Sequence, residues 1–234
     1  MSGNFSALSA IPDFDPRALP VELDATTLPA VDPARLSPAA LRERFANPPA
    51  WSPELTGDRF RLRAEPPRAA AVLVPIVAHE TGVTVLLTER TSHLHDHAGQ
   101  VAFPGGRRDA HDPDDVATAL REAHEEIGLE PHAVDVLAQL PVYLTGTGYS
   151  VTPVVGLVRP GVELRLDAFE VAHAFEVPLA FLMDPRFHQR RRIVIGDVER
   201  TFYAMPYRGD GGREFFIWGA TAAMLRNLYR MLSA

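Results

Sequence analysis

Prolines interrupt the first part of the chain so often that only one stretch there can form a regular helix. They occupy positions 12, 16, 20, 29, 33, 38, 48, 49, 53 and 66. Proline lacks a backbone N–H and clashes with the preceding helical turn, so helices do not run through such a segment. The exception is the stretch 37–45, where Ser37 suits the N-cap and Pro38 the first helical position. We therefore expect residues 1–66 to form a proline-rich N-terminal extension and residues 67–234 to form the folded domain.

Beyond the extension, the pattern of apolar residues predicts both strands and helices. The runs AAAVLVPIVA and VTVLLTER flank Gly82 and predict a β-hairpin. Further strands are expected at 134–144, 150–158, 191–197 and 200–207. Helices are expected at 114–127, 179–183 and 218–232. This order predicts an α+β domain in which helices pack against a sheet.

Composition excludes several classes of function. The 23 basic and 30 acidic side chains give a net charge of −7, which argues against nucleic acid as a partner. There is no cysteine, so disulfides, thiol nucleophiles and cysteine-ligated metals are excluded. No apolar run approaches the roughly 18 residues of a membrane span, and the first residues do not resemble a signal peptide. We expect a cytoplasmic protein that does not bind membranes.

The segment 103–129 carries the densest set of polar signals. Pro104 and the two glycines after it predict a turn, Asp112 and Pro113 predict a helix start, and Gly128 predicts a helix end. An apolar stripe would pack this helix on the sheet, and it consists of Val116, Ala119, Leu120, Ala123 and Ile127. The segment is therefore expected to be a loop followed by an amphipathic helix.

Three glutamates, Glu122, Glu125 and Glu126, fall within one turn of that helix. Like charges at this spacing repel each other, so a compensating cation is expected near them. Carboxylate oxygens suit Mg²⁺ or Mn²⁺, which retain water positions that phosphate oxygens and a nucleophile can use. The alternative is a solvated acidic face that pairs with Arg121.

The wider pattern resembles the signature of the Nudix hydrolase family. That signature has a glycine, an acidic residue, then Arg-Glu, two residues, Glu-Glu, one residue and a glycine. The matching residues here are Gly106, Asp112, Arg121, Glu122, Glu125, Glu126 and Gly128. The chain departs from it in having Asp112 rather than glutamate, and one extra residue between Gly106 and Arg121.

Both departures are similar to the coenzyme A pyrophosphatase subgroup of that family. The subgroup also has an upstream motif, which reads LLTERTSHLHDHAGQVAFPGG over residues 86–106 of this chain, with every spacing kept. Thr91 stands where the motif has serine or alanine, and His95 stands where it has arginine. Arginine binds phosphate bidentately whereas histidine is charged only conditionally, so His95 bears on whether coenzyme A is the substrate.

The resemblance implies a Nudix-type mixed central sheet between helices and a small-molecule nucleotide substrate. It implies hydrolysis of coenzyme A or acyl-CoA to 3′,5′-ADP and 4′-phosphopantetheine or its acyl form, with Mg²⁺ as the cofactor and Mn²⁺ as an alternative. Two alternatives stay open. One is a Nudix pyrophosphatase for another nucleoside diphosphate derivative, such as ADP-ribose or NADH, and the other is a non-catalytic nucleotide-binding module.

The resemblance also implies roles for individual residues. The catalytic set is Arg121 with the three glutamates, and Arg121 is expected to pair with Asp112 or Asp109. The metal ligands are expected to be Glu122, Glu126, Glu125 and a carbonyl of Gly105 or Gly106. The residues expected to bind substrate are Arg90, His95, Arg107 and Arg108. Glu125 or Glu170 is a candidate for the base. The apolar C-terminal helix and the N-terminal arm make a homodimer plausible.

Overall fold

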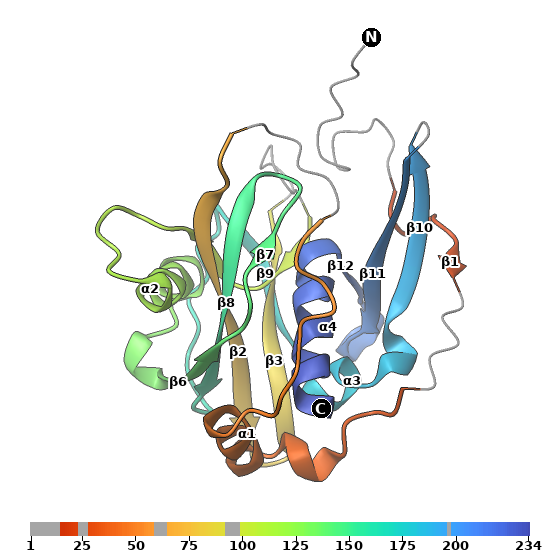
Figure 1. Cartoon of the computed structure of the whole chain (residues 1–234). Helices are drawn as coiled ribbons and strands as arrows, with labels where there is room; N and C mark the ends of the chain where they lie inside the picture. Colours follow the sequence, from red (N-terminus) through yellow and green to blue (C-terminus); the bar gives the residue numbers. More distant parts are fainter. Residues whose placement is uncertain (1–14, 23–27, 59–64, 92–98, 196–197) are drawn as a thin grey trace.

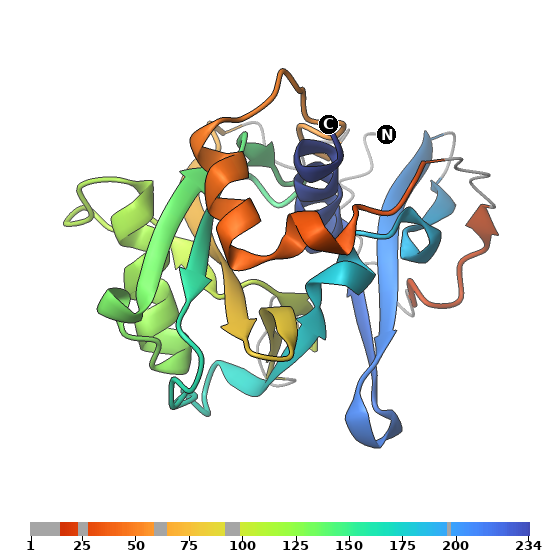
Figure 2. The ribbon, with the colours of Figure 1, turned by 90° about the horizontal axis from the view of Figure 1, so that it is seen from below.

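The computed structural model describes residues 15–22, 28–58, 65–91, 99–195 and 198–234. Its elements form four layers, which from left to right in Figure 1 are helix α2, a larger sheet, helix α4 and a smaller sheet. Figure 2 shows the same order from below. The helices are α1 (Pro38–Ala46), α2 (Asp115–Ile127), α3 (Leu179–Leu182) and α4 (Gly219–Ser233). Single 3₁₀ turns occur at Pro33–Leu36, Pro131–Ala133, Pro185–Phe187 and Asp210–Gly212.

The larger sheet is mixed, because β2 and β8 run parallel while its other pairs are antiparallel. Its main path runs β4 (Val101–Ala102), β3 (Gly82–Arg90), β2 (Arg68–His79), β8 (Tyr149–Val158), β6 (Val134–Gln139). Three more strands join it: β5 (Gly105–Arg107) on β2, β7 (Tyr143–Leu144) on β8 and β9 (Val171–Pro178) on β3. The predicted α+β class with a mixed central sheet is confirmed.

The smaller sheet is antiparallel and was not predicted as a separate layer. Its order is β1 (Val21–Glu22), β10 (Gln189–Ile195), β11 (Val198–Arg208), β12 (Glu214–Trp218). The strand expected at 191–197 is β10, and its last two expected residues lie outside the described residues. The single strand expected at 134–144 is wrong in its extent. It is divided into β6 and β7 around Pro141, which has no N–H for a strand ladder.

The described part of the N-terminal extension packs into the main hydrophobic core rather than standing apart from it. Val31, Leu36, Leu41 and Phe45 are all buried there. Arg44 of α1 donates to the carbonyl of Met231 at 3.0 Å, near the end of α4. Prolines prevent regular structure without removing apolar side chains, so such a segment can still cover a core. The boundary between extension and domain at residue 66 stays a prediction.

Helix α4 lies between the two sheets and is buried on almost every side. Residues Thr221–Tyr229, Met231 and Leu232 are all buried. The apolar surface that suggested a homodimer is therefore covered within the chain. The homodimer stays a prediction without support from this helix. Among the helices of the described residues, none is long and apolar enough to cross a membrane.

A buried polar cluster ties α4 to the N-terminal extension and to the segment that follows α3. Arg226, 3% exposed, donates to Glu54 Oε2 at 2.8 Å and lies 3.2 Å from Nδ1 of His188. Nε2 of His188 lies 2.8 Å from the carbonyl of Leu182. An arginine can only donate, so Nδ1 must accept and Nε2 must carry the proton, which makes this histidine neutral. Burial lowers the pKa of His188 to about 4.

Because the pKa of His188 is lowered, we expect the folded protein to lose stability in mild acid. The unfolded chain takes up a proton near pH 6.5 and the folded chain only near pH 4, so stability present above pH 6.5 is lost as the pH falls between those values. The loss amounts to roughly 3 kcal/mol in the free energy of unfolding. Urea unfolding at several pH values should show it as a difference between two proteins: as the pH falls from 6.5 to 4, His188→Gln should gain stability relative to the natural protein. An equal pH dependence of stability in both proteins would contradict this account.

Candidate functional site

Helix α2 is placed by its caps and by one apolar face. Asp114 is the N-cap and accepts from the N–H of Ala117 at 2.8 Å, and Gly128 ends the helix with a left-handed φ of 68°. Ala119, Ala123 and Ile127 are fully buried against the larger sheet. The predicted loop and amphipathic helix are confirmed. The glutamates on the neighbouring face are thereby directed toward β5.

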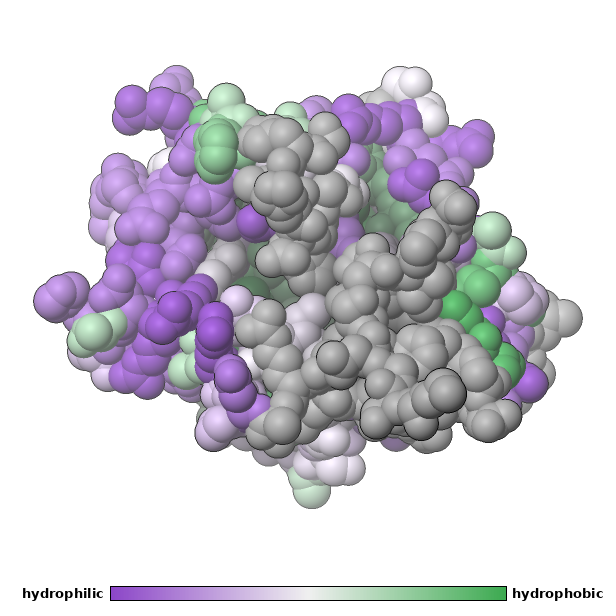
Figure 3. Space-filling view, turned by 90° about the horizontal axis from the view of Figure 1, so that it is seen from above, coloured by the Kyte–Doolittle hydropathy of each residue, from purple (hydrophilic) through white to green (hydrophobic). Residues whose placement is uncertain are grey.

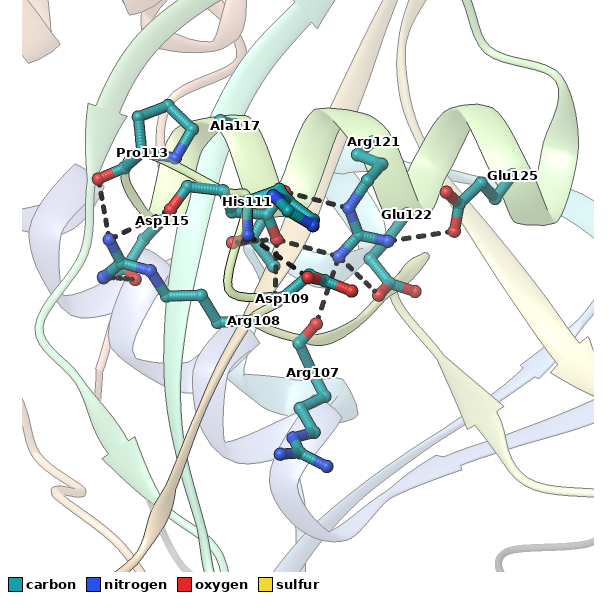
Figure 4. A network of polar contacts seen from close by, with 12 residues as sticks. Arg107, Arg108, Asp109, His111, Pro113, Asp115, Ala117, Arg121, Glu122 and Glu125 are labelled. Carbon is teal, nitrogen blue, oxygen red and sulfur yellow. Dashed lines mark hydrogen bonds and ion pairs between the residues drawn. The ribbon is translucent and has the colours of Figure 1, made fainter.

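Arg121 fastens the preceding loop to this helix. Its guanidinium donates to both carboxylate oxygens of Asp112 at 2.9 Å. It also donates to the carbonyl of Arg107 at 3.1 Å, as Figure 4 shows. The predicted pairing with Asp112 is confirmed, whereas Asp109 serves the turn itself by accepting from the N–H of Asp112. Hydrogen bonds from Arg121 hold the pKa of Asp112 well below its usual range.

Arg121 also contacts two of the three glutamates. It lies 2.9 Å from Glu122 and 2.9 Å from Glu125, whose side chain is 57% exposed. Figure 4 shows Glu125 directed along the helix toward Arg121. Within the described residues, no three histidine or acidic side chains are arranged to hold a metal ion. The expected convergence of all three glutamates is therefore absent from this arrangement, while their roles stay predictions.

Glu122 and Glu126 lie instead against the two glycines of β5. Glu126 is 5% exposed and accepts from the N–H of Gly105 at 3.1 Å. Glu122 packs so closely on Gly106 that an added Cβ would overlap its carboxylate. Burial raises the pKa of Glu126 to about 7 and raises that of Glu122 as well. Two desolvated carboxylates beside a glycine backbone are hard oxygen donors, which suits Mg²⁺ or Mn²⁺.

Arg90 and Glu170 adjoin this pair from other strands. Arg90, at the end of β3, lies 3.5 Å from Glu126 and 3.9 Å from Glu170. The backbone before β9 is anchored, because the N–H of Thr91 donates to the carbonyl of Glu170 at 3.0 Å and the N–H of Asp167 to that of Glu126 at 2.9 Å. The structure thus brings Glu170 beside Glu126, and its role as a base stays a prediction.

The remaining residues expected to bind substrate differ in their surroundings. The guanidinium of Arg108 donates to the carbonyl of Pro113 at 2.7 Å and lies 3.4 Å from Asp115, so it braces the loop. The side chain of Arg107 points away from α2 in Figure 4. His95 lies outside the described residues. The view in Figure 3 shows hydrophilic residues gathered on the side that carries α2.

Sequence reasoning missed one further anchor of the helix start. Thr152 of β8 is buried and donates to Oδ2 of Asp115 at 2.8 Å, while Oδ1 of the same carboxylate faces Arg108. The signal in the sequence was an isolated threonine in an otherwise apolar strand. A buried hydroxyl needs a partner, and an acidic residue in the first helical turn can supply one.

Comparison with known proteins identifies relatives of the chain. The NUDIX domain family model matches residues 66–195. The Escherichia coli K12 protein described as uncharacterized Nudix hydrolase NudL is 44% identical over 163 residues, which cover 69% of this chain and 81% of that protein. The Caenorhabditis elegans Ap4A hydrolase is 20% identical with a TM-score of 0.40, covering 48% of this chain and 80% of that structure. RenU, a Nudix hydrolase from Mycobacterium smegmatis, is 25% identical with a TM-score of 0.42, covering 49% and 73%.

Alanine should have different effects at the two glycines: it should lower turnover at Gly106 and stability at Gly105. In Gly106→Ala the new Cβ meets the movable carboxylate of Glu122, so turnover should fall by about tenfold or more with little change in stability. In Gly105→Ala the Cβ lies 2.5 Å from the backbone of Ala71 and Val72, at a φ of 153°. That variant should lose about 2 kcal/mol or more of stability. Thermal unfolding and turnover of both variants test this, and equal stability losses would contradict it.

Proposed function

The chain belongs to the Nudix family of hydrolases, and from that premise we propose that it is a pyrophosphatase acting on coenzyme A or acyl-CoA. Water would add to one phosphorus of the phosphoanhydride while the bond from that phosphorus to the bridging oxygen breaks. The products would be 3′,5′-ADP and 4′-phosphopantetheine or its acyl form. The observation that carries the proposal is the buried Glu126 on the N–H of Gly105, with Glu122 beside it.

Nudix hydrolases generally use divalent metal ions, and we propose Mg²⁺ for this enzyme, with Mn²⁺ as a substitute. The residues that would hold the ion are Glu122, Glu126 and a carbonyl of Gly105 or Gly106, with Glu125 as a further ligand. When bound, such an ion neutralises phosphate oxygens and makes water a better nucleophile. The buried donors support this assignment, because a divalent ion compensates the cost of desolvating two carboxylates.

The other side chains would position the substrate and remove a proton. Arg121 keeps the glycine turn against α2 through Asp112, which holds both carboxylates in place. Glu170 is our candidate for the base that accepts the proton of the attacking water, since its carboxylate adjoins the same cluster. Arg107 is the proposed phosphate ligand on β5, because the guanidinium of Arg108 is engaged by the loop.

The assignment to coenzyme A rests on the upstream motif at 86–106. Its described part includes Arg90 and the glycine turn, which lie beside Glu126. His95 in place of arginine favours the alternative that another nucleoside diphosphate derivative, such as ADP-ribose or NADH, is cleaved. In either case the partner is a small nucleotide. The cytoplasmic location stays a prediction.

Product analysis would distinguish these substrates. The purified chain would be incubated with Mg²⁺ and, separately, with coenzyme A, ADP-ribose, NADH and a nucleoside triphosphate. We expect release of 3′,5′-ADP from coenzyme A to be fastest. Cleavage of another compound instead would retain the catalytic helix and reject the coenzyme A assignment. No cleavage of any of the four, despite metal binding, would favour the non-catalytic module.

Glu126→Gln should abolish most of the turnover while the fold remains. The amide has the same shape and can still accept from the N–H of Gly105, but it lacks the charge that would hold the ion. We expect turnover to fall by roughly 10³-fold. Glu130→Gln removes the same charge just beyond the end of α2, at an exposed pair with His124, and should leave turnover unchanged. Near-normal turnover in Glu126→Gln would reject the metal assignment.

A further inference from the structure

Among the described residues, Arg90 is the cation that lies beside Glu126, the most buried glutamate of the site. Its guanidinium lies between Glu126 of α2 and the residue that precedes β9, Glu170, at 3.5 and 3.9 Å. The backbone on each side of Arg90 is fixed, because its N–H donates to the carbonyl of Gln100 and its carbonyl accepts from the N–H of Gly99. The main chain is therefore held, while among the described residues the side chain of Arg90 has only these two long contacts.

The other arginine of the site is held very differently. Arg121 makes two hydrogen bonds of 2.9 Å to Asp112 and a third of 3.1 Å to the carbonyl of Arg107. Bidentate pairs of this kind fix a guanidinium in orientation as well as in position. The contact of Arg90 with Glu126 is at the limit of a hydrogen bond, and that with Glu170 is electrostatic alone. Arg121 is a fixed part of the site, whereas Arg90 can leave its position at little cost.

We propose that Arg90 is an exchangeable counter-ion, which neutralises Glu126 in the metal-free enzyme and is displaced from it when a divalent cation binds. This inference rests on the proposed function, since it takes Glu126 to be a metal ligand. A buried, ionised carboxylate is costly unless a cation lies near it, and Arg90 is the cation that the structure places beside Glu126. A divalent ion and a guanidinium on one carboxylate repel each other, so the long contact of Arg90 is the one that gives way when the ion binds.

In this exchange Arg90 acts through Glu126, as a positioning residue, and its presence lowers the affinity of the site for the metal ion. Displacing the guanidinium from Glu126 subtracts from the free energy of metal binding. Removing its charge should therefore raise metal affinity, whereas a residue that merely supports the ligands would lower affinity when lost. The displaced guanidinium is then available to substrate phosphate, the role that the sequence predicts for Arg90. Because the exchange concerns metal binding alone, it can be tested without measuring turnover.

The test is calorimetric titration of Mn²⁺ into the protein without substrate, at pH 8.5, where protons compete little for the carboxylates. Arg90→Gln should bind Mn²⁺ about fivefold more tightly or better, from the repulsion removed. Arg208→Gln removes the same charge from β11, where Arg208 pairs with the exposed Glu214, and its Mn²⁺ affinity should stay within about twofold of that of the natural protein. Arg90→Lys keeps the charge, so its Mn²⁺ affinity should be closer to that of the natural protein than to that of Arg90→Gln.

Unchanged or weaker binding in Arg90→Gln would overturn the inference, provided that circular dichroism shows the fold intact. If Arg90→Gln does not fold, Arg90→Lys provides the test. A Mn²⁺ affinity of Arg90→Lys well below that of the natural protein would then overturn the inference. Absence of Mn²⁺ binding in the natural protein would overturn the proposed metal site, and this inference with it. Tight binding by the natural protein with no gain in Arg90→Gln would overturn this inference alone.

Discussion

The site depends on the bidentate pair between Arg121 and Asp112. It joins the loop that precedes α2 to the middle of that helix, and a further hydrogen bond from Arg121 to the carbonyl of Arg107 fixes the glycine turn before that loop. Gly105 and Gly106 are then held against Glu126 and Glu122. Without a side chain on Gly106, Glu122 approaches the backbone of β5, and Glu126 does so by accepting from the N–H of Gly105, so both carboxylates lose much of their water. Their raised pKa values and their fit to a hard cation both follow from that approach.

Charge balance around these carboxylates is achieved with arginine. Glu122 and Glu125 share Arg121, while Glu126 and Glu170 share Arg90. One guanidinium is fixed by short bonds and the other is held at longer range. With one permanent and one exchangeable arginine at the site, the protein can stay folded without a metal ion and can still bind one. The same arrangement explains why three glutamates do not converge: Glu125 is directed to the fixed arginine.

The loop and helix could be predicted from sequence because their signals are local. Caps, a glycine stop and an apolar stripe all lie within the segment 103–129, and so does the pairing of Arg121 with Asp112. The second sheet, β9 and β12 could not be predicted, because they depend on partners far along the chain. The packing of Leu41 into the core was hidden by the prolines around it. Arg108 was expected at the substrate because carbonyl partners, such as that of Pro113, leave no trace in a sequence.

The central claim is that Glu122 and Glu126, beside the glycine turn, hold a divalent cation. Anomalous diffraction from crystals of the protein soaked in Mn²⁺ tests it most directly, since the signal locates the ion without reference to activity. The account predicts a strong anomalous peak in contact with the carboxylates of both residues. A peak held only by other residues, or none at millimolar Mn²⁺ in well-ordered crystals, would contradict it.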